Sequence, residues 1–119
     1  MKKASRELVR MVYDAINKSE KFKRDYRLRD QATAAAVSTM SNIAEGFSRH
    51  SNKEFGQFLF ISKSSASEVQ SIFYAALDQK YIDQNTFETV YAQAVKVSQI
   101  DSGMIKYLSS KPKKRNKHK

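Results

Sequence analysis

Apolar residues recur along this chain at the spacing of helices and not at the alternating spacing of strands. Leu8, Val12 and Ile16 fall at i, i+4 and i+8, which places them on one buried face of a helix. Longer stretches with the same periodicity follow, and short polar segments separate them. The pattern predicts helices over residues 5–18, 28–47, 52–80 and 84–108, with a polar connection over residues 18–27.

Polar residues mark the expected helix ends. Ser5 is the expected N-cap of the first helix, and Ser51 with Glu54 three residues later forms the pattern of a capping box. Asp83 is placed to cap the last helix. Gly46 lies near the expected end of the second helix, where a left-handed conformation suits glycine.

The third predicted helix is apolar on more than one side. Its core stripe runs through Phe55, Leu59 and Val69, while other apolar residues fall off that stripe. A helix that is apolar all round is buried on more than one face, and in a small domain the second face is expected to meet another subunit. Glu68 lies between small serines, on a face that is either solvated or a subunit contact. The expected oligomer interface is Phe60, Ile61, Glu68 and Ile72.

Two residues interrupt the pattern of the last helix. Asp101 occupies a position where an apolar residue is expected, and we expect it at the rim of the core or paired with a nearby base. Gly103 lies inside the helix, where glycine costs about 1 kcal/mol relative to alanine. We therefore expect this last stretch to fray or bend.

The scarcity of helix-breaking residues and the length of the chain indicate the fold class. The chain has 119 residues with only three Gly and one Pro, which favours long helices in one domain. Helices of similar length joined by short segments pack as bundles. We expect an all-α protein, an antiparallel up-and-down four-helix bundle over residues 1–110, followed by a disordered basic tail at residues 111–119.

Positive charge is the main clue to a partner. The net charge is +10, and six of the bases lie in residues 111–119 without any acid, which leaves +4 for the rest. A basic excess favours anionic partners such as nucleic acid, although a tail of this kind can also serve solubility alone. The expected nucleic-acid-binding residues are Lys111, Lys113, Lys114, Arg115 and Lys117 in the tail, with Lys21, Lys23, Arg24, Arg27 and Arg29 as a second group.

Aromatic residues interleave with the second group of bases. Phe22 and Tyr26 stand among five bases and two acids in residues 18–27. Aromatic side chains in a basic segment can stack on nucleic-acid bases. They can equally close the end of a helical bundle, and the sequence leaves both interpretations open.

The segment between the second and third helices carries an unusual acid. Glu45 lies in the last turn of a helix, where the helix dipole disfavours a negative charge, and Arg49 four residues later can compensate. Asn42, one turn earlier, can bond to carbonyl groups at the helix end. The segment is either a structural corner held by an ion pair or a recognition corner. Its expected residues are Asn42, Glu45, Gly46, Arg49, Ser51 and Glu54.

Residues typical of catalysis are scarce. Cysteine is absent, and the two histidines are His50 and His118, neither of which is part of a Glu-x-x-His pattern. No phosphate-binding glycine loop is present. We expect no enzymatic activity, no metal and no cofactor. No signal peptide and no run of about 18 apolar residues is found, so a cytoplasmic location without membrane contact is expected.

Residues 41–59 carry a family resemblance. Ser41-Asn42-Ile43-Ala44-Glu45-Gly46, followed by Arg49-x-Ser51-x-Lys53-Glu54-Phe55-x-x-Phe58-Leu59, resembles the signature of four-helix-bundle proteins encoded in ribosomal-RNA intervening sequences. Residues 28–38 resemble the upstream helix of that family, and the resemblance covers residues 4–108. Met40 departs from the family pattern, which usually has Pro there.

The resemblance implies a ring-shaped homo-oligomer, a pentamer. The fold is also similar to that of the accessory variability protein of diversity-generating retroelements, which binds nucleic acid and a reverse transcriptase. Two functions are therefore expected as alternatives. The first is a non-catalytic oligomer that binds RNA or DNA, and the second is a protein-interaction scaffold for a partner enzyme such as a reverse transcriptase.

Overall fold

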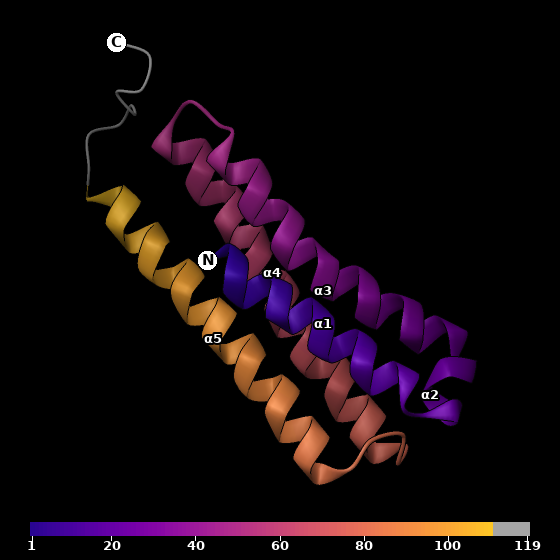
Figure 1. Cartoon of the computed structure of the whole chain (residues 1–119). Coiled ribbons are helices and arrows are strands. Elements are labelled where there is room, and N and C mark those ends of the chain that lie inside the picture. Colours follow the sequence, from indigo (N-terminus) through magenta and orange to yellow (C-terminus); the bar gives the residue numbers. More distant parts are fainter. Residues whose placement is uncertain (111–119) are drawn as a thin grey trace.

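A computed structural model describes residues 1–110, which form helices without any strand. The all-α fold class is confirmed in this part of the chain, whereas the expected disordered tail lies outside the described residues. Helix α3 packs along α4, α4 packs along α5, and α1 lies against α3 and α5 (Figure 1). The helices are α1 (Lys2–Asn17), α2 (Glu20–Arg24), α3 (Tyr26–Phe47), α4 (Asn52–Asp78) and α5 (Gln84–Ser109).

Helix α1 is shorter than its neighbours and covers only part of their length. It has 16 residues, against 22 to 27 in α3, α4 and α5, and its N-terminus lies near the middle of the molecule (Figure 1). The core is accordingly divided into two clusters. The larger lies under α1, and the smaller gathers Ile43, Phe55, Leu59 and Leu108 near the α3–α4 turn. At that end the three long helices pack together without α1.

The polar connection expected over residues 18–27 is wrong, because Glu20–Arg24 form α2 and α3 already begins at Tyr26. The Ser19 hydroxyl accepts a hydrogen bond from the backbone N–H of Phe22 at 3.1 Å and so caps the helix. Phe22 is fully buried, and its ring packs against the rings of Phe73 and Tyr81. One buried aromatic and one cap hold this short helix across the end of the long ones.

Of the three predicted N-caps, two are confirmed and one is wrong. The hydroxyl of Ser51 accepts from the N–H of Glu54 at 3.1 Å, and the Asp83 carboxylate accepts from the N–H of Thr86 at 2.8 Å. Ser5 is not an N-cap, because α1 begins at Lys2. It lies fully buried within α1 and donates to the Lys2 carbonyl at 3.1 Å. The first turn forms because Ala4, ahead of Ser5, is already buried in the core.

Gly46 does not end α3 in a left-handed conformation. It lies inside the helix, and Ser48 is the C-cap with right-handed angles. A Cβ atom at Gly46 would lie 2.8 Å from Cδ1 of Phe55. The glycine is therefore required by the close approach of α3 to α4 and not by the geometry of the turn.

Asp101 is neither at the rim nor paired with a base. It is fully buried on α5, and the Ser62 hydroxyl of α4 donates to its Oδ2 at 2.6 Å. Burial raises the pKa of Asp101 to about 6, against the lowering effects of the Ser62 hydrogen bond, the Met1 amino group and Lys63. The last helix does not fray at Gly103, because α5 continues through it to Ser109.

Candidate nucleic-acid interface

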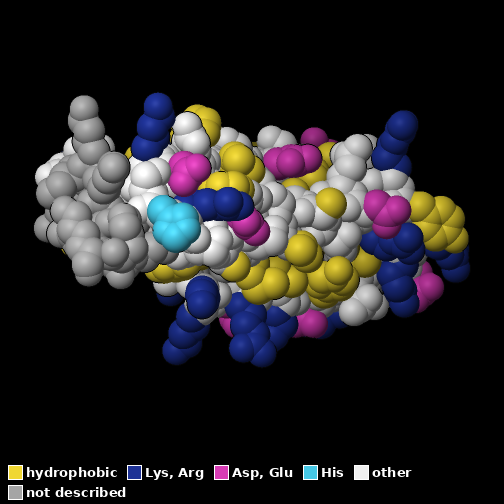
Figure 2. Space-filling view, turned by 90° about the horizontal axis from the view of Figure 1, so that it is seen from above, with side chains coloured by type: hydrophobic (Ala, Val, Ile, Leu, Met, Phe, Trp, Pro, Cys, Tyr) yellow, Lys and Arg dark blue, Asp and Glu magenta, His cyan; other side chains and the backbone are white. Residues whose placement is uncertain are grey.

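The second group of predicted bases is brought together where α2 meets α3. Lys21, Lys23 and Arg24 lie on α2, and Arg27 and Arg29 lie on the first turns of α3, on either side of the junction. Figure 2 shows Lys and Arg side chains gathered at the end of the molecule farthest from the grey atoms. We call these five residues the basic corner.

The junction residue fixes the two helices of the basic corner. One oxygen of the Asp25 carboxylate accepts from the N–H of Leu28 at 3.1 Å and caps α3. The other accepts from the Tyr81 hydroxyl at 2.8 Å, beyond the end of α4. This hydrogen bond raises the pKa of Tyr81 above its usual value, together with burial and the Asp25 charge. Asp25 thus caps α3 and ties the basic corner to the segment that follows α4.

Acidic neighbours offset part of the positive charge. Nζ of Lys23 lies 2.6 Å from Glu20, and the Arg24 guanidinium lies 4.0 Å from the same carboxylate. Arg29 pairs with Asp30 at 3.1 Å. These side chains are exposed or partly exposed, and such pairs are weak in water. The hydrogen bond from Lys23 lowers the pKa of Glu20, so that acid stays ionised at neutral pH.

The two aromatic residues of this segment have opposite roles. Phe22 closes the end of the bundle, as one of the two sequence interpretations held. Tyr26, four residues later, is 64% exposed and is not part of the core. The sequence could not separate them, because both stand among bases at helical spacing.

The first group of predicted bases lies outside the described residues. Lys111, Lys113, Lys114, Arg115 and Lys117 follow Ser110, which lies at the opposite end of the molecule from α2 (Figure 1). The described residues extend 53 Å along their long axis. The basic corner and Ser110 therefore lie at opposite ends of the described residues.

The α3–α4 corner has the local contacts of a structural element. Arg49 pairs with Glu45, and its guanidinium lies 4.7 Å from the centre of the Phe58 ring. The expected ion pair between Glu45 and Arg49 is thereby confirmed. The contact of Arg49 with Phe58 connects this pair to α4.

Asn42 forms its hydrogen bond with a carbonyl one turn earlier in α3 than expected. Its amide nitrogen donates to the backbone carbonyl of Ser38 at 2.8 Å, and not to a carbonyl at the helix end. It also lies 3.0 Å from the Ser38 hydroxyl, which in turn lies 2.8 Å from the hydroxyl of Ser65 on α4. This chain of hydrogen bonds links α3 to α4.

The predicted oligomer residues divide between surface and core. Phe60 is 61% exposed and Ile61 is 45% exposed, and Glu68 is also exposed. Ile72 was wrongly placed with them, because it is only 6% exposed and packs in the core of its own chain. Ile72 lies three residues after Val69 and one before Phe73, so it belongs to the buried stripe of α4.

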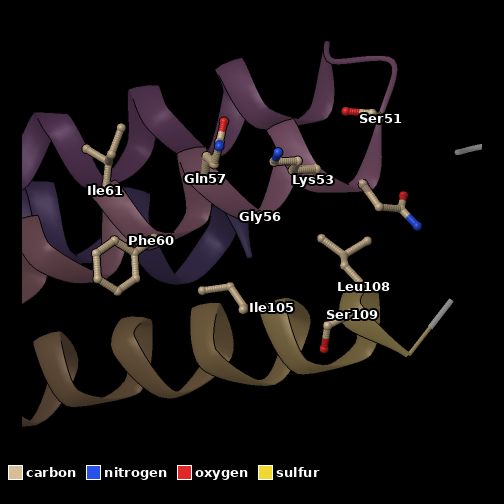
Figure 3. A pocket seen from close by; sticks show the side chains of 10 residues that line it. Ser51, Lys53, Gly56, Gln57, Phe60, Ile61, Ile105, Leu108 and Ser109 are labelled. Carbon is tan, nitrogen blue, oxygen red and sulfur yellow. The ribbon is translucent and has the colours of Figure 1, made fainter. Parts of the chain in front are cut away.

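An open groove lies between the beginning of α4 and the end of α5. Its volume is about 1110 Å³, and Figure 3 shows Phe60 pointing toward α5 and Ile105 pointing toward α4 across it. The sequence did not predict the groove, because it requires the pairing of α4 with α5. Its lining residues are Ser51, Asn52, Lys53, Gly56, Gln57, Phe60, Ile61, Ile105, Leu108 and Ser109.

Neither a metal site nor a membrane span is found in the described part of the chain. Residues 1–110 hold no group of three or more His, Asp or Glu side chains that could bind a metal ion. No helix in this part of the chain is both long enough and apolar enough to cross a membrane.

Comparison with known proteins places the chain in a family. The model of the 23S rRNA-intervening sequence protein family matches residues 1–103, which include the basic corner, the α3–α4 corner and most of α5. The chain belongs to this family. The resemblance seen in residues 41–59 is thereby confirmed, while residues 111–119 lie outside the match. No curated protein matches the chain.

A solved structure shows the same fold as this 23S rRNA-intervening sequence family member. It is the crystal structure of a protein of unknown function from the S23 ribosomal protein family of Bacteroides thetaiotaomicron. The two chains are 21% identical and superpose with a TM-score of 0.78, over 88% of this chain and 97% of the other. At this level of identity the likeness shows the fold alone.

Proposed function

We propose that this member of the 23S rRNA-intervening sequence protein family is a non-catalytic homo-oligomer that binds RNA or DNA in the cytoplasm. The observation that carries the proposal is the basic corner, where five Lys and Arg residues lie on α2 and the first turns of α3, on either side of a junction at which Tyr26 is exposed. Lys and Arg bind phosphates with release of counterions, whatever the base sequence. The name of the family, which refers to 23S rRNA, supports a role associated with RNA.

The proposed architecture is an antiparallel, up-and-down bundle whose four helices are α1, α3, α4 and α5. The packing of α1 against α3 and α5, and of α4 against the same two helices, supports this topology. Helix α2 then closes one end. The basic corner is held at that end by Phe22 and Asp25, so it is positioned by the fold.

Oligomer formation is the second part of the proposal. Phe60 and Ile61 are large apolar side chains exposed beside an open groove, and such surfaces mark contacts with another protein. A ring of five copies would repeat the basic corner and the tail bases five times. Sites that are weak alone would then bind one nucleic acid with high avidity.

The oligomer is tested by the mass of the assembly in solution. Phe60→Lys with Ile61→Lys places two charges in the apolar contact, so light scattering coupled to size exclusion should find a smaller particle with unchanged helix content. A matched variant, Ala34→Lys with Ser41→Lys on the exposed side of α3, should keep its mass. Equal masses for all three proteins would contradict the proposed contact.

A scaffold for a partner enzyme such as a reverse transcriptase is the second candidate function. The observation that favours it is the same apolar groove, which has room for a segment of another protein. The two functions differ in their dependence on charge. A scaffold that holds its partner through the groove keeps its binding when the basic residues are removed, whereas a nucleic-acid-binding protein does not.

Nucleic-acid binding is tested by fluorescence anisotropy with labelled RNA and DNA oligonucleotides at low and moderate salt. The full chain and a version that ends at Ser110 are compared. We expect binding that weakens steeply with salt, and weaker binding by the shortened chain because it lacks six bases. Absence of binding at low salt would contradict the nucleic-acid proposal and favour the scaffold.

A further inference from the structure

Tyr26 is exposed at a position where the fold does not need an aromatic residue. Phe22, one helical turn earlier in the sequence, fills the end of the core with none of its surface exposed. Asp25 then ends α2 and begins α3, so Tyr26 starts a new helix and is 64% exposed. The side chain that the bundle requires is Phe22, and Tyr26 is available for another contact.

Arg29 holds a fixed position against the ring of Tyr26. Its guanidinium carbon lies 4.9 Å from the ring centre. The same guanidinium donates to the backbone carbonyl of Lys23 at 3.2 Å and to the Asp30 carboxylate at 3.1 Å. Because these bonds orient Arg29, the tyrosine ring is packed on one side by a flat cation while most of its surface stays in water.

Three exposed cations lie within five residues of Tyr26 in the chain. Lys21 and Arg27 are exposed, and neither forms an ion pair with another side chain of residues 1–110. The Arg24 side chain is 76% exposed, and its guanidinium lies 4.0 Å from the exposed carboxylate of Glu20, a pair that is weak in water. An exposed aromatic ring in a segment of exposed cations is typical of sites that bind single strands, in which bases stack on the ring and phosphates meet the cations.

We infer that the basic corner binds a single-stranded polynucleotide, with an unpaired base stacked on Tyr26 and phosphates held by Lys21, Arg24 and Arg27. The inference rests on the proposed nucleic-acid function and adds the strand class and the stacking residue. A duplex offers its phosphates to the same cations, but its bases are stacked inside the helix and cannot reach the tyrosine ring. Single strands therefore gain a contact that duplexes lack.

The chain contains no tryptophan, so one substitution introduces a specific optical probe of stacking. The Tyr26→Trp variant is titrated with a 15-nucleotide oligo(U) or oligo(dT), and with a hairpin duplex, until anisotropy shows equal occupancy. We expect the tryptophan emission to be quenched by the single strand and not by the duplex. The control is Tyr13→Trp on the exposed side of α1, which should show no quenching by either nucleic acid.

Affinity gives the second measurement. Tyr26→Ala should weaken single-strand binding by about tenfold, within the range found when one base loses its aromatic partner. Tyr26→Phe should keep the affinity within about threefold, because the ring remains. Duplex binding should be the same for the wild type and both variants, and thermal melts show that each variant is folded.

The outcomes separate the inference from the function on which it rests. If the wild type binds single strands and duplexes equally, and Tyr26→Ala changes neither, the stacking site is wrong while nucleic-acid binding stands. Quenching in the Tyr13→Trp control equal to that in Tyr26→Trp would also overturn the site. If the wild type binds no nucleic acid at low salt, the proposed function itself fails, and the inference fails with it.

Discussion

Asp101 places a carboxyl group in the core between α4 and α5. Its only hydrogen bond within the described residues comes from the Ser62 hydroxyl, at 2.6 Å to Oδ2, while Oδ1 is buried without one. Burial favours the neutral form, which is why the pKa of Asp101 rises from 3.8 to about 6. At neutral pH the ionised form therefore weakens the fold.

The sign of the pH dependence follows from this pKa. Because the folded-state pKa lies above the unfolded value, the contribution of Asp101 to stability is fully present below pH 3.8 and is lost as the pH rises through about 6. The loss is on the order of 2–3 kcal/mol, since one pKa unit corresponds to about 1.4 kcal/mol. The Asp101→Asn variant cannot ionise at this position, so it does not lose this stability as the pH rises.

We predict that urea unfolding at a series of pH values shows this difference. The free energy of unfolding of Asp101→Asn, relative to the wild type, should increase between pH 4 and pH 7. Comparing the two proteins at each pH removes the effects of all other titrating groups. Stability curves that stay parallel over this range would contradict the assignment to Asp101.

The glycines of α3 and α5 make a matched pair. A methyl group on Gly46 would meet the Phe55 ring at 2.8 Å, whereas at Gly103 no atom lies within 4 Å of the added group. Alanine is favoured over glycine within a helix by about 1 kcal/mol at either position. Only at Gly46 is this gain opposed by overpacking of a buried ring.

We therefore predict opposite changes in the melting temperature. Gly103→Ala should stabilise the protein by up to about 1 kcal/mol. Gly46→Ala should destabilise it by about 1–2 kcal/mol, after the helix gain is subtracted from the overpacking cost. Thermal melts followed by circular dichroism measure both, and stabilisation by Gly46→Ala would show that α3 and α4 can move apart without cost.

At the scale of a single element, the stability of helix α2 depends on one side chain. Phe22 is the only fully buried residue of this five-residue helix, and it lies 5.9 Å from the Phe73 ring and 5.6 Å from the Tyr81 ring. Helices this short have little stability of their own. The position of the basic corner therefore relies on the contact between Phe22 and the core.

We predict that Phe22→Ala lowers the free energy of unfolding by about 3–5 kcal/mol, as loss of a buried aromatic ring does. Tyr26→Ala, four residues away, should change it by less than about 0.5 kcal/mol because the ring is largely exposed. Chemical denaturation of the two variants makes the comparison. Equal effects would contradict the separate roles given to the two aromatics.

The same elements show how far the sequence alone could predict the structure. Periodicity located the long helices, and the Ser51 and Asp83 caps were predicted correctly because capping depends on neighbouring residues. Helix α2 was missed, since its stability comes from Phe73 and Tyr81, which are distant in the sequence. The cap expected at Ser5 failed for a similar reason, because burial of Ala4 extends α1.

At the scale of the whole molecule, the two proposed contact surfaces lie far apart. The basic corner is at the α2 end, and the groove lies between the beginning of α4 and the end of α5, near the α3–α4 turn (Figures 1 and 3). This separation allows one surface to bind nucleic acid while the other contacts a neighbouring copy. Mutations at Phe60 and Ile61 can thus test oligomer formation without altering the basic corner.

The candidate sites could be predicted only in part. Charge in the sequence identified the bases of the basic corner, but not that Tyr26 rather than Phe22 is the exposed aromatic. Apolar residues off the core stripe identified Phe60 and Ile61 correctly as surface residues. Ile72 was misplaced, because the width of a buried stripe depends on how many helices pack against it.

The salt dependence of single-strand binding by the full chain tests the central claim most directly. A variant with Lys21, Arg24 and Arg27 changed to alanine is compared with a control in which three exposed bases elsewhere are removed, so both lose the same charge. The control positions are Lys3, Lys96 and Lys106.

We predict that the slope of log Kd against log salt concentration falls by about 2 in the basic-corner variant, since each phosphate contact to a single strand contributes about 0.7. The control should keep the wild-type slope. If both variants lose the same slope, binding follows net charge alone and the basic corner is not the site.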